Sequence, residues 1–245
     1  MKTNNKAPHY RVDIYGQYYE RSKHHDPYYA NMDCFWRPIF DSCRIWSGEN
    51  HDEHVDLGLP SGTMWASKNL GAIDVDDPGY YFAWGEIKPK KEYAWNTYKF
   101  YRKGKLTKYV YRARYSGPCP DDGKLFLEFC DDAAVHEMGP KWRIPTLQQA
   151  NELKDVCKWQ QAVSHNGIRG VAVVGPNGNS IFLPYTGRVC GKGMMWIAEE
   201  GNIMTSFINF NSPMDVRPLS FEDESVGFGL LYRCEGIPVR PVYIG

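Results

Sequence analysis

Carboxylate side chains that are adjacent in the sequence are the first candidates for chemistry in this chain. They form the groups Asp121-Asp122, Asp131-Asp132, Glu199-Glu200 and Glu222-Asp223-Glu224. A glycosidase needs two carboxylates on either side of the bond that it cleaves, and adjacent residues are not placed in that way. The sequence also lacks a GxSxG nucleophile elbow, a P-loop and a dinucleotide-binding glycine pattern. We therefore interpret the acidic groups as solvated faces or helix starts and expect that the protein is not an enzyme.

Residue types that bind metals are present, but their spacing does not indicate a metal site. The histidine groups His24-His25 and His51-Asp52-Glu53-His54 lack the helical i, i+4 spacing of metal ligands. The seven cysteines are odd in number and never form a CxxC pair, which favours buried thiols. They are Cys34, Cys43, Cys119, Cys130, Cys157, Cys190 and Cys234. We predict no metal and no cofactor.

Side chains that could bind a partner by contact are concentrated near the C-terminus. Aromatic rings offer a large contact area at a low cost in conformational entropy. The candidates are Trp196, Phe207, Phe221 and Tyr232, and the alternative for each is a place in the core of a strand-rich domain. Acidic residues could rim the same face and select basic or hydroxyl-rich partners. These are Glu199, Glu200, Asp215, Glu222, Asp223 and Glu224.

Composition excludes several classes of partner. The 245 residues carry a net charge of zero, so nothing indicates binding to nucleic acid or to an anionic membrane surface. No apolar run approaches the roughly 18 residues that a membrane span requires. The first residues lack the apolar core of a secretory signal, and the sequence leaves the location of the protein open. An aromatic content of 15% favours strands and turns over helical bundles.

The pattern of the chain changes near residue 54. Residues 1–54 contain many aromatic residues among charges, with little periodicity, and are too aromatic for a typical disordered tail. We predict an irregular, aromatic-rich N-terminal extension over 1–54 and one domain over 55–245. Within that domain, residues 92–120 are predicted to be a loop with short strands.

Two helices are predicted from their end signals. Asp131-Asp132 places acidic residues at the start of a short helix, and Gly139-Pro140 ends it. Thr146 lies three residues before Gln149, which is the spacing of a capping box. The second helix is therefore expected to begin at Thr146 and to continue to about residue 157.

Two hairpins are predicted from turn residues. The run Gly175–Asn179 separates the β-prone segments 171–174 and 180–183. A second hairpin is expected from residue 54 onward, around Leu59–Gly62. These helices and hairpins predict a small α+β domain, with Trp65, Trp142 and Phe182 in its core.

The C-terminal part is expected to form further strands. Residues 205–210 are predicted to alternate, with Phe207 and Phe210 pointing inward, and residues 226–232 form the next candidate strand. Residues 237–242 contain Pro238 and Pro241, which restricts this run to an edge or an irregular strand. Arg240 is expected to close the sheet.

Six sequence blocks in this order resemble those of a known family, the Fibrobacter succinogenes major paralogous domain, which is abundant in gut Bacteroidetes. The blocks are VDLGLPSGTMWA, GYYFAWGE, DDAA, WRIPT, GPNGNSIFLP and GIPVRPV, and they span residues 55–242. The sequence departs from the family at Gln149-Ala150, where members often have an acid followed by an aromatic residue. It also diverges between Trp196 and Gly236.

The resemblance implies a C-type-lectin-like fold of the formylglycine-generating-enzyme type. In this fold two short helices and small antiparallel sheets support long loops, and the N- and C-terminal strands pair. The oxidase branch of the fold uses a reactive pair of cysteines, for which Cys190 and Cys234 are the candidates here, without the surrounding motif. The Glu-Pro-Asn, Gln-Pro-Asp and Trp-Asn-Asp motifs of calcium-dependent sugar binding are absent.

The same fold serves in the variable proteins of diversity-generating retroelements, including receptor-binding proteins of phage tails. Their diversity lies just before the C-terminus, which is where residues 196–236 diverge. Adenine mutagenesis of Asn codons that end in a pyrimidine cannot produce Glu or Met, so Glu199 and similar positions would be fixed. The positions open to variation include Asn202, Ser206, Asn209, Asn211, Asp223 and Tyr232.

We predict a non-catalytic ligand-binding or adhesion domain whose contact face is formed mainly by residues 190–236. The expected partner is a glycan or protein on a cell surface, and the oligomeric state is left open. A variable receptor-binding protein and an oxidase are the alternatives. The predicted binding residues are Trp196, Glu199, Asn202, Ser206, Asn209, Asn211, Asp223 and Tyr232.

Overall fold

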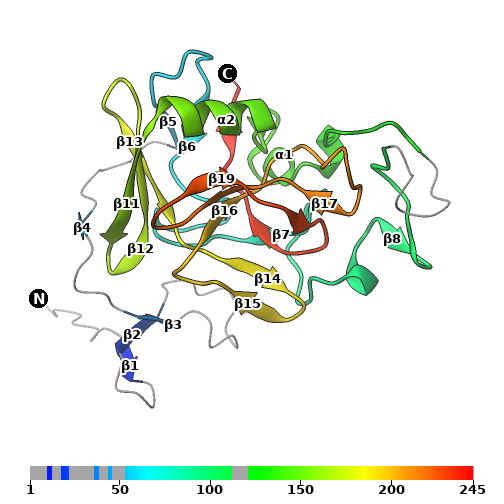
Figure 1. Cartoon of the computed structure of the whole chain (residues 1–245), viewed down its shortest axis with the longest axis horizontal. Helices are drawn as coiled ribbons and strands as arrows, with labels where there is room; N and C mark the ends of the chain where they lie inside the picture. Colours follow the sequence, from blue (N-terminus) through cyan, green and yellow to red (C-terminus); the bar gives the residue numbers. More distant parts are fainter. Residues whose placement is uncertain are drawn as a thin grey trace, which may run out of the picture.

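The last strand of the chain is built into the same sheet as the first strands of the domain. In the computed structural model, β22 (Val242–Tyr243) lies between β6 (Met64–Ala66) and β10 (Trp142–Arg143). The strand β5 (His54–Asp56) pairs with the other side of β6 and completes a four-stranded antiparallel sheet (Figure 1). The pairing of β5 with β6 confirms the hairpin predicted around Leu59–Gly62.

The structure describes residues 53–111 and 121–244, together with the backbone of four short strands that precede them. Of these four strands, β1, β2 and β3 form an antiparallel sheet, and β4 pairs in parallel with β11. Their bounds are Tyr10–Val12, Tyr18–Arg21, Trp36–Pro38 and Arg44–Ile45. The histidines at 24, 25 and 51, the cysteines at 34, 43 and 119, and residues 112–120 of the predicted loop lie outside the described residues.

The second large sheet contains the predicted hairpin. Strand β12 (Ile168–Val174) pairs with β13 (Ser180–Pro184), with Val171 opposite Leu183, which confirms this hairpin. The turn between them crosses the end of β5, where a Cβ atom on Gly175 would lie 2.0 Å from the carbonyl oxygen of Leu57. Only glycine fits there, and the turn sequence therefore also fixes how the two sheets meet.

Both predicted helices are present. Helix α1 (Ala133–Met138) is capped by Asp132, whose side chain accepts hydrogen bonds from two backbone amides, and it ends at Gly139. Helix α2 (Leu147–Val156) begins with the capping box of Thr146 and Gln149. With 6 and 10 residues, neither of these helices of the described chain is long and apolar enough to cross a membrane.

Short strands make up most of the remaining structure, which gives an α+β fold with small, mostly antiparallel sheets. Strand β11 (Lys158–His165) pairs with β12, and the segment that follows β13 folds back over the domain below α2 (Figure 1). Its strands pair as β14 with β15, β18 with β16 and β19, and β17 with β20, while β21 pairs with β7 and β8 with β9. The bounds are β7 Tyr81–Phe82, β8 Tyr101–Arg102, β9 Lys105–Leu106, β14 Arg188–Cys190, β15 Gly193–Met195, β16 Gly201–Ile203, β17 Asp215–Val216, β18 Leu219–Phe221, β19 Val226–Phe228, β20 Leu231–Tyr232 and β21 Ile237–Pro238. Two 3₁₀ turns, Trp95–Thr97 and Phe129–Asp131, complete the described elements.

A buried arginine joins the two large sheets. The guanidinium of Arg240 is fully buried and donates to Asn69 Oδ1, to the Ala66 carbonyl at the end of β6 and to the Phe182 carbonyl in β13, at 2.8–3.1 Å. Burial lowers the pKa of Arg240 because it disfavours the charged form. The three acceptors offset this cost. Arg240 was expected to close one sheet, and in the structure it connects two.

The three predicted core residues are confirmed, since Trp65, Trp142 and Phe182 are all buried. Other expectations for the C-terminal part are wrong. Residues 205–210 form isolated bridges at Phe207 and Ile208 instead of a strand, and Phe210 is exposed while Ile208 is buried.

The candidate strand over residues 226–232 is divided into β19 and β20, and the run 237–242 is divided into β21 and β22. Strand β22 is an interior strand, which pairs with β10 on one side and with β6 on the other. Pro241 lies just before it, so neither of its two residues lacks the backbone amide that a paired strand needs. Strand β11 was not expected, since its polar, largely half-buried residues give no alternating pattern.

Substitution of Arg240 should show how much the sheet junction contributes to stability. Arg240→Ala leaves buried acceptors without donors and creates a cavity, so the free energy of unfolding should fall by about 3 kcal/mol or more. Arg102→Ala, at an exposed position of β8, should change it by less than about 0.5 kcal/mol. Urea denaturation measures both, and equal unfolding midpoints for the two variants would contradict this role of Arg240.

Candidate ligand-binding surface

The C-terminal segment exposes many large apolar side chains. Five of the ten that are exposed in the described part of the chain lie in residues 190–236, although most described residues lie outside this segment. They are Met195, Trp196, Phe210, Leu230 and Tyr232. Exposed apolar side chains of this size mark a contact surface only where they are grouped.

The eight predicted binding residues divide into an exposed and a buried set. Trp196, Glu199, Asn211 and Tyr232 are exposed, and Asp223 exposes 43% of its side chain. Asn202, Ser206 and Asn209 are buried. Their burial counts against the prediction that these last three residues contact a partner.

The buried residues hold the segment together. The side chain of Asn202 accepts a hydrogen bond from Ser220 Oγ at 2.7 Å and donates to Glu200 Oε1 at 2.8 Å, which ties β16 to β18. Asn209 Oδ1 accepts from the Asn211 amide at 3.2 Å and shapes a turn. Buried polar groups need such partners, and these contacts explain why polar residues occur in the interior here.

Asp223 is exposed in part but already has two partners. It forms an ion pair with Arg169 in β12 and accepts a hydrogen bond from Tyr185 Oη at 2.9 Å. Burial raises the pKa of Tyr185, and the hydrogen bond to the Asp223 carboxylate raises it further. The Asp223 side chain thus anchors the turn between β18 and β19 to the second sheet.

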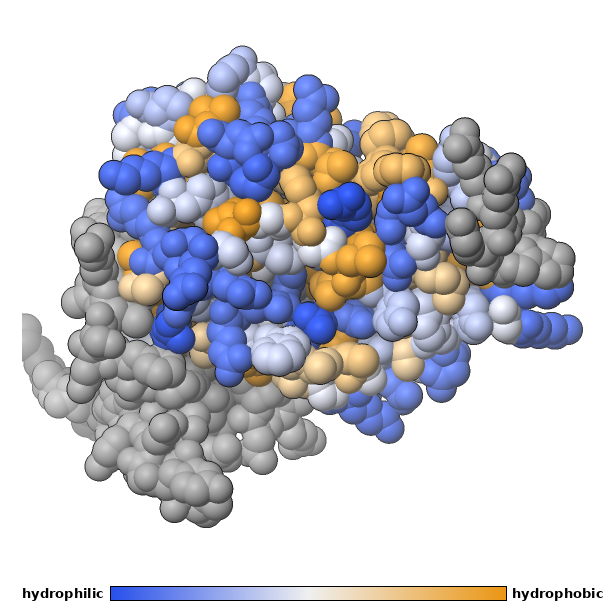
Figure 2. All heavy atoms as spheres, in the orientation of Figure 1, coloured by the Kyte–Doolittle hydropathy of each residue, from blue (hydrophilic) through white to orange (hydrophobic). Residues whose placement is uncertain are grey.

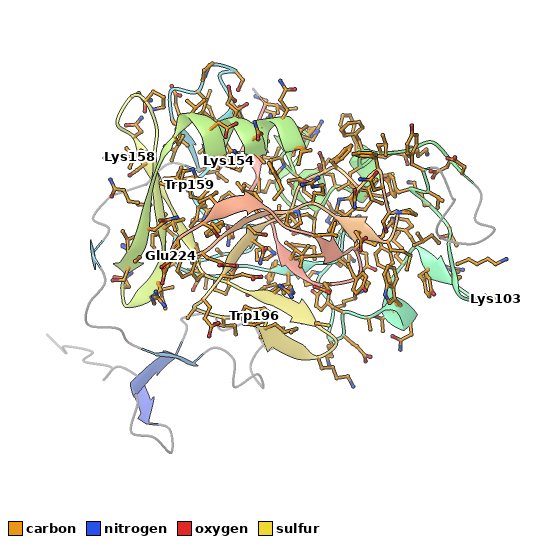
Figure 3. The ribbon with its side chains drawn as sticks, viewed as in Figure 1. Lys103, Lys154, Lys158, Trp159, Trp196 and Glu224 are labelled. Atoms are coloured by element: carbon orange, nitrogen blue, oxygen red, sulfur yellow. The ribbon has the colours of Figure 1, made fainter. Side chains whose placement is uncertain are left out.

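The exposed predicted residues Trp196 and Tyr232 have different neighbours. Trp196 lies beside the β14–β15 hairpin, at the opposite edge of the molecule from α2 (Figure 3). Tyr232 instead lies near Trp95, with ring centroids 5.9 Å apart, and Trp95 contacts Tyr101 at 5.0 Å. Trp95 and Tyr101 belong to residues 92–120, which were predicted to be a loop with short strands and lie far from Tyr232 in the sequence. No local pattern in the sequence indicated that they would contact Tyr232.

A groove with aromatic walls is a candidate site that described residues form. It has a volume of about 610 Å³, opens to solvent and lies along the first turns of α2. We call it the phenylalanine groove. Its lining residues are Phe126, Phe207, Phe228, Arg217, Thr146, Leu147, Gln148 and Asn151. Figure 2 shows hydrophobic residues gathered in a band between α2 and β17, within a more polar surface.

Backbone hydrogen bonds position the walls of the phenylalanine groove. Residues on either side of Phe126 and Phe207 bond to each other, from the Leu127 amide to the Ser206 carbonyl and from the Ile208 amide to the Leu125 carbonyl, both at 3.0 Å. The two phenylalanine rings lie with centroids 5.2 Å apart. The Ser206 amide also donates to the Pro145 carbonyl at 2.8 Å, which attaches this wall to the start of α2.

Some of the polar side chains that line the groove already form hydrogen bonds within the protein, and others do not. Thr146 takes part in the capping box, and Asn151 donates to Asp155 at 2.7 Å. The side chains of Gln148 and Arg217 make no hydrogen bond or ion pair to any described residue. The Arg217 guanidinium lies 6.0 Å from the centroid of the Phe228 ring. Sequence reasoning identified Phe207 but missed Phe126, Arg217 and Phe228, which lack a local signal.

One acidic group has residue types that could hold a metal ion. The ligand atoms of Glu128, Cys130 and Asp131 lie within 4.8 Å of one another. The Asp131 oxygens, however, accept hydrogen bonds from the ammonium groups of Lys99 at 2.8 Å and Lys108 at 2.5 Å. Because two cations already occupy this carboxylate, we interpret the group as an ion-pair network that joins residues 99–108 to α1.

The two C-terminal cysteines differ in environment. Cys190 is exposed, and Cys234 is buried. Burial, together with the neighbouring charge of Glu235, raises the pKa of the Cys234 thiol to about 12. The thiolate is the reactive form of cysteine, so Cys234 is an unreactive thiol at neutral pH.

The chain was also compared with known proteins. No protein-family model, curated protein or solved structure matches it. The candidate binding residues therefore follow from the structure of this chain alone, and they are the residues that line the phenylalanine groove.

The buried position of Asn202 leads to a test of the corrected assignment. Asn202→Ala removes three side-chain hydrogen bonds, to Ser220, Glu200 and the Gly187 carbonyl, and leaves part-buried partners behind. The free energy of unfolding should therefore fall by about 1–3 kcal/mol. Glu199→Ala, at an exposed position of the same segment, should have an effect below about 0.5 kcal/mol. Chemical denaturation distinguishes them, and a negligible effect of Asn202→Ala would restore this residue as a candidate contact.

The Asp131 network predicts a dependence of stability on pH. Burial alone would raise the pKa of Asp131, but hydrogen bonds from Lys108, Lys99 and Tyr109 outweigh it and hold the pKa below 3.8. Ionised Asp131 therefore stabilises the fold above the unfolded pKa, and this stabilisation is lost as the pH falls through the lower, folded value.

Asp131→Asn should accordingly destabilise the protein by roughly 1–3 kcal/mol near neutral pH and by less in acid. Unfolding midpoints of wild type and variant, measured at several pH values, provide the comparison. A loss of stability that is the same at all pH values would contradict the proposed charge pairing.

Proposed function

We propose that the protein is a non-catalytic ligand-binding domain whose binding site is the phenylalanine groove. The observation that carries this proposal is the combination of three phenylalanine side chains with two unused polar groups, on Gln148 and Arg217, in one open groove. A volume of about 610 Å³ lies within the range of small-molecule sites. Apolar walls with a few polar groups that fix orientation are the usual composition of such sites.

The rigidity of the groove supports a binding role. Its walls come from three parts of the chain, and backbone hydrogen bonds join them to each other and to the start of α2. A ligand would therefore meet walls that are already in place, which lowers the entropic cost of binding. Phe126 remains 55% exposed in this arrangement, and a bound ligand would bury its ring.

The proposal of a non-catalytic domain is supported by the state of the candidate catalytic groups. Asp131 and Asp223 are both engaged in ion pairs, and Cys234 has a raised pKa. The phenylalanine groove contains no carboxylate, histidine or cysteine among its lining residues. An oxidase based on Cys190 and Cys234 gains no support from a buried, protonated thiol.

We also retain the C-type-lectin-like fold and the resemblance to the Fibrobacter succinogenes major paralogous domain as part of the proposal. Two observations support them: the two short helices among small sheets, and the position of the C-terminal β22 beside β6. The predicted partner is a glycan or protein on a cell surface. A groove of about 610 Å³ would take up a terminal group of such a partner rather than the whole molecule.

The alternative of a variable receptor-binding protein is weakened by burial. Asn202, Ser206 and Asn209, three of the six positions proposed for variation, are buried. Random substitution at such positions would remove hydrogen bonds that hold the segment. A diversified surface needs exposed positions that tolerate change, so the fixed groove is the preferred site.

A matched pair of phenylalanine variants tests the proposed site. Phe126 lines the groove, whereas Phe129, three residues later and 66% exposed, does not. The probe is the fluorescent dye 8-anilinonaphthalene-1-sulfonate, which binds to exposed apolar sites. Loss of one aromatic wall in Phe126→Ala should weaken dye binding by about 10-fold, whereas Phe129→Ala should bind like the wild type.

Fluorescence titration of the folded proteins gives the dissociation constants, and urea midpoints confirm that both variants remain folded. If the native protein does not bind the dye, or if the two variants bind it equally, the groove is not the site.

A further inference from the structure

Arg217 differs from the other buried or half-buried arginines of the described chain in the hydrogen bonds of its guanidinium. Arg143, Arg169, Arg188, Arg233 and Arg240 each donate hydrogen bonds from the guanidinium to protein acceptors. Arg217 donates none to any described residue. Its Nε atom is buried without a hydrogen-bond partner, as are the Nε atoms of Arg169 and Arg188, so Arg217 differs from those two in that its terminal nitrogens are uncommitted as well. A ligand in the groove can supply the acceptor that these terminal nitrogens lack.

The surroundings of Arg217 favour an anionic acceptor. No acidic side chain lines the phenylalanine groove, so the arginine gives it a net positive charge. The groove also runs along the first turn of α2, a helix of 10 residues, where backbone amides carry partial positive charge. Gln148, in this first turn, provides a further uncommitted amide. A guanidinium binds a carboxylate or a phosphate through two parallel hydrogen bonds. The single guanidinium of this groove matches the one charge of a carboxylate better than the nearly two charges of a phosphate monoester.

The rest of the groove favours an apolar body next to the charged group. The rings of Phe126 and Phe207 lie 5.2 Å apart on one wall, and Phe228 lies on the side of Arg217. The volume of about 610 Å³ suits a small molecule rather than an extended protein surface. We propose that the phenylalanine groove binds a small organic carboxylate with an aromatic or aliphatic body, and that Arg217 holds its carboxylate. This inference rests on the function proposed above and adds the chemical class of the ligand.

The test compares two ligands that differ only in charge. The probes are 4-phenylbutyrate and its neutral amide, 4-phenylbutyramide, and binding is followed by chemical-shift changes in the ¹⁵N-labelled full-length protein. The wild type should bind the acid about 10-fold more tightly than the amide, or better, because hydrogen bonds to charged groups are the stronger ones. Acetate, which lacks the apolar body, should not bind measurably at the same concentrations.

Two variants assign the preference to Arg217. In Arg217→Gln the preference for the acid over the amide should disappear, so that the two probes bind about equally. Arg217→Lys keeps the charge without the planar fork and should retain only part of the preference. The Arg217 guanidinium has no hydrogen-bonded partner in the described chain, so its replacement breaks no hydrogen bond and both variants should fold. The ¹H–¹⁵N spectrum of the backbone amides verifies this directly.

The outcomes separate this inference from the function on which it rests. Equal binding of acid and amide by the wild type would overturn the carboxylate assignment and leave the groove as a binding site. An undiminished preference in Arg217→Gln would overturn the role of Arg217. Binding of acetate as tight as that of 4-phenylbutyrate would show a simple anion site, which also overturns the inference. Absence of binding by both phenyl probes would count against the groove itself.

Discussion

The burial of two arginine side chains near the C-terminus is the constraint on which the rest of the structure depends. Arg240 connects the two large sheets through three acceptors, and Arg233 lies seven residues earlier. Arg233 is fully buried between the rings of Trp84 and Tyr98, and its guanidinium donates to Tyr98 Oη and to backbone carbonyls. A buried cation requires such compensation, so the chain between these residues can pass through the domain in one arrangement only. The segment before Arg233, which carries Phe207, Arg217 and Phe228 of the groove, is thereby fixed at its C-terminal end.

Local signals in the sequence were sufficient for the helices and for two hairpins. The capping box of Thr146 and the turn Gly175–Asn179 involve residues that interact within a few positions, and their chemistry is visible in the sequence itself. The candidate site depends on contacts of another kind. Phe126 meets Phe207 across a separation of 81 residues, and the burial of Asn202 depends on Ser220 in another strand. Periodicity cannot reveal such pairs, because residues 205–210 form bridges without a regular strand.

The three environments of arginine show how one residue type serves different purposes in this fold. Arg240 and Arg233 have acceptors all around and act as structural connections. Arg169 and Arg188 form ion pairs with carboxylates of the C-terminal segment and fix its loops. Arg217 has the aromatic neighbour but no acceptor. This lack of an acceptor is the reason why we propose the phenylalanine groove as the binding site.

A fragment screen by solution NMR of the ¹⁵N-labelled protein tests the central claim most directly. The library contains neutral aromatic compounds, aromatic carboxylates and monosaccharides, and the perturbed amides are mapped on the structure. Our account predicts that the tightest fragments perturb amides around Phe207, Arg217 and the first turn of α2. Perturbations confined to other surfaces, such as those around Trp196 or around Trp95 and Tyr232, would contradict it.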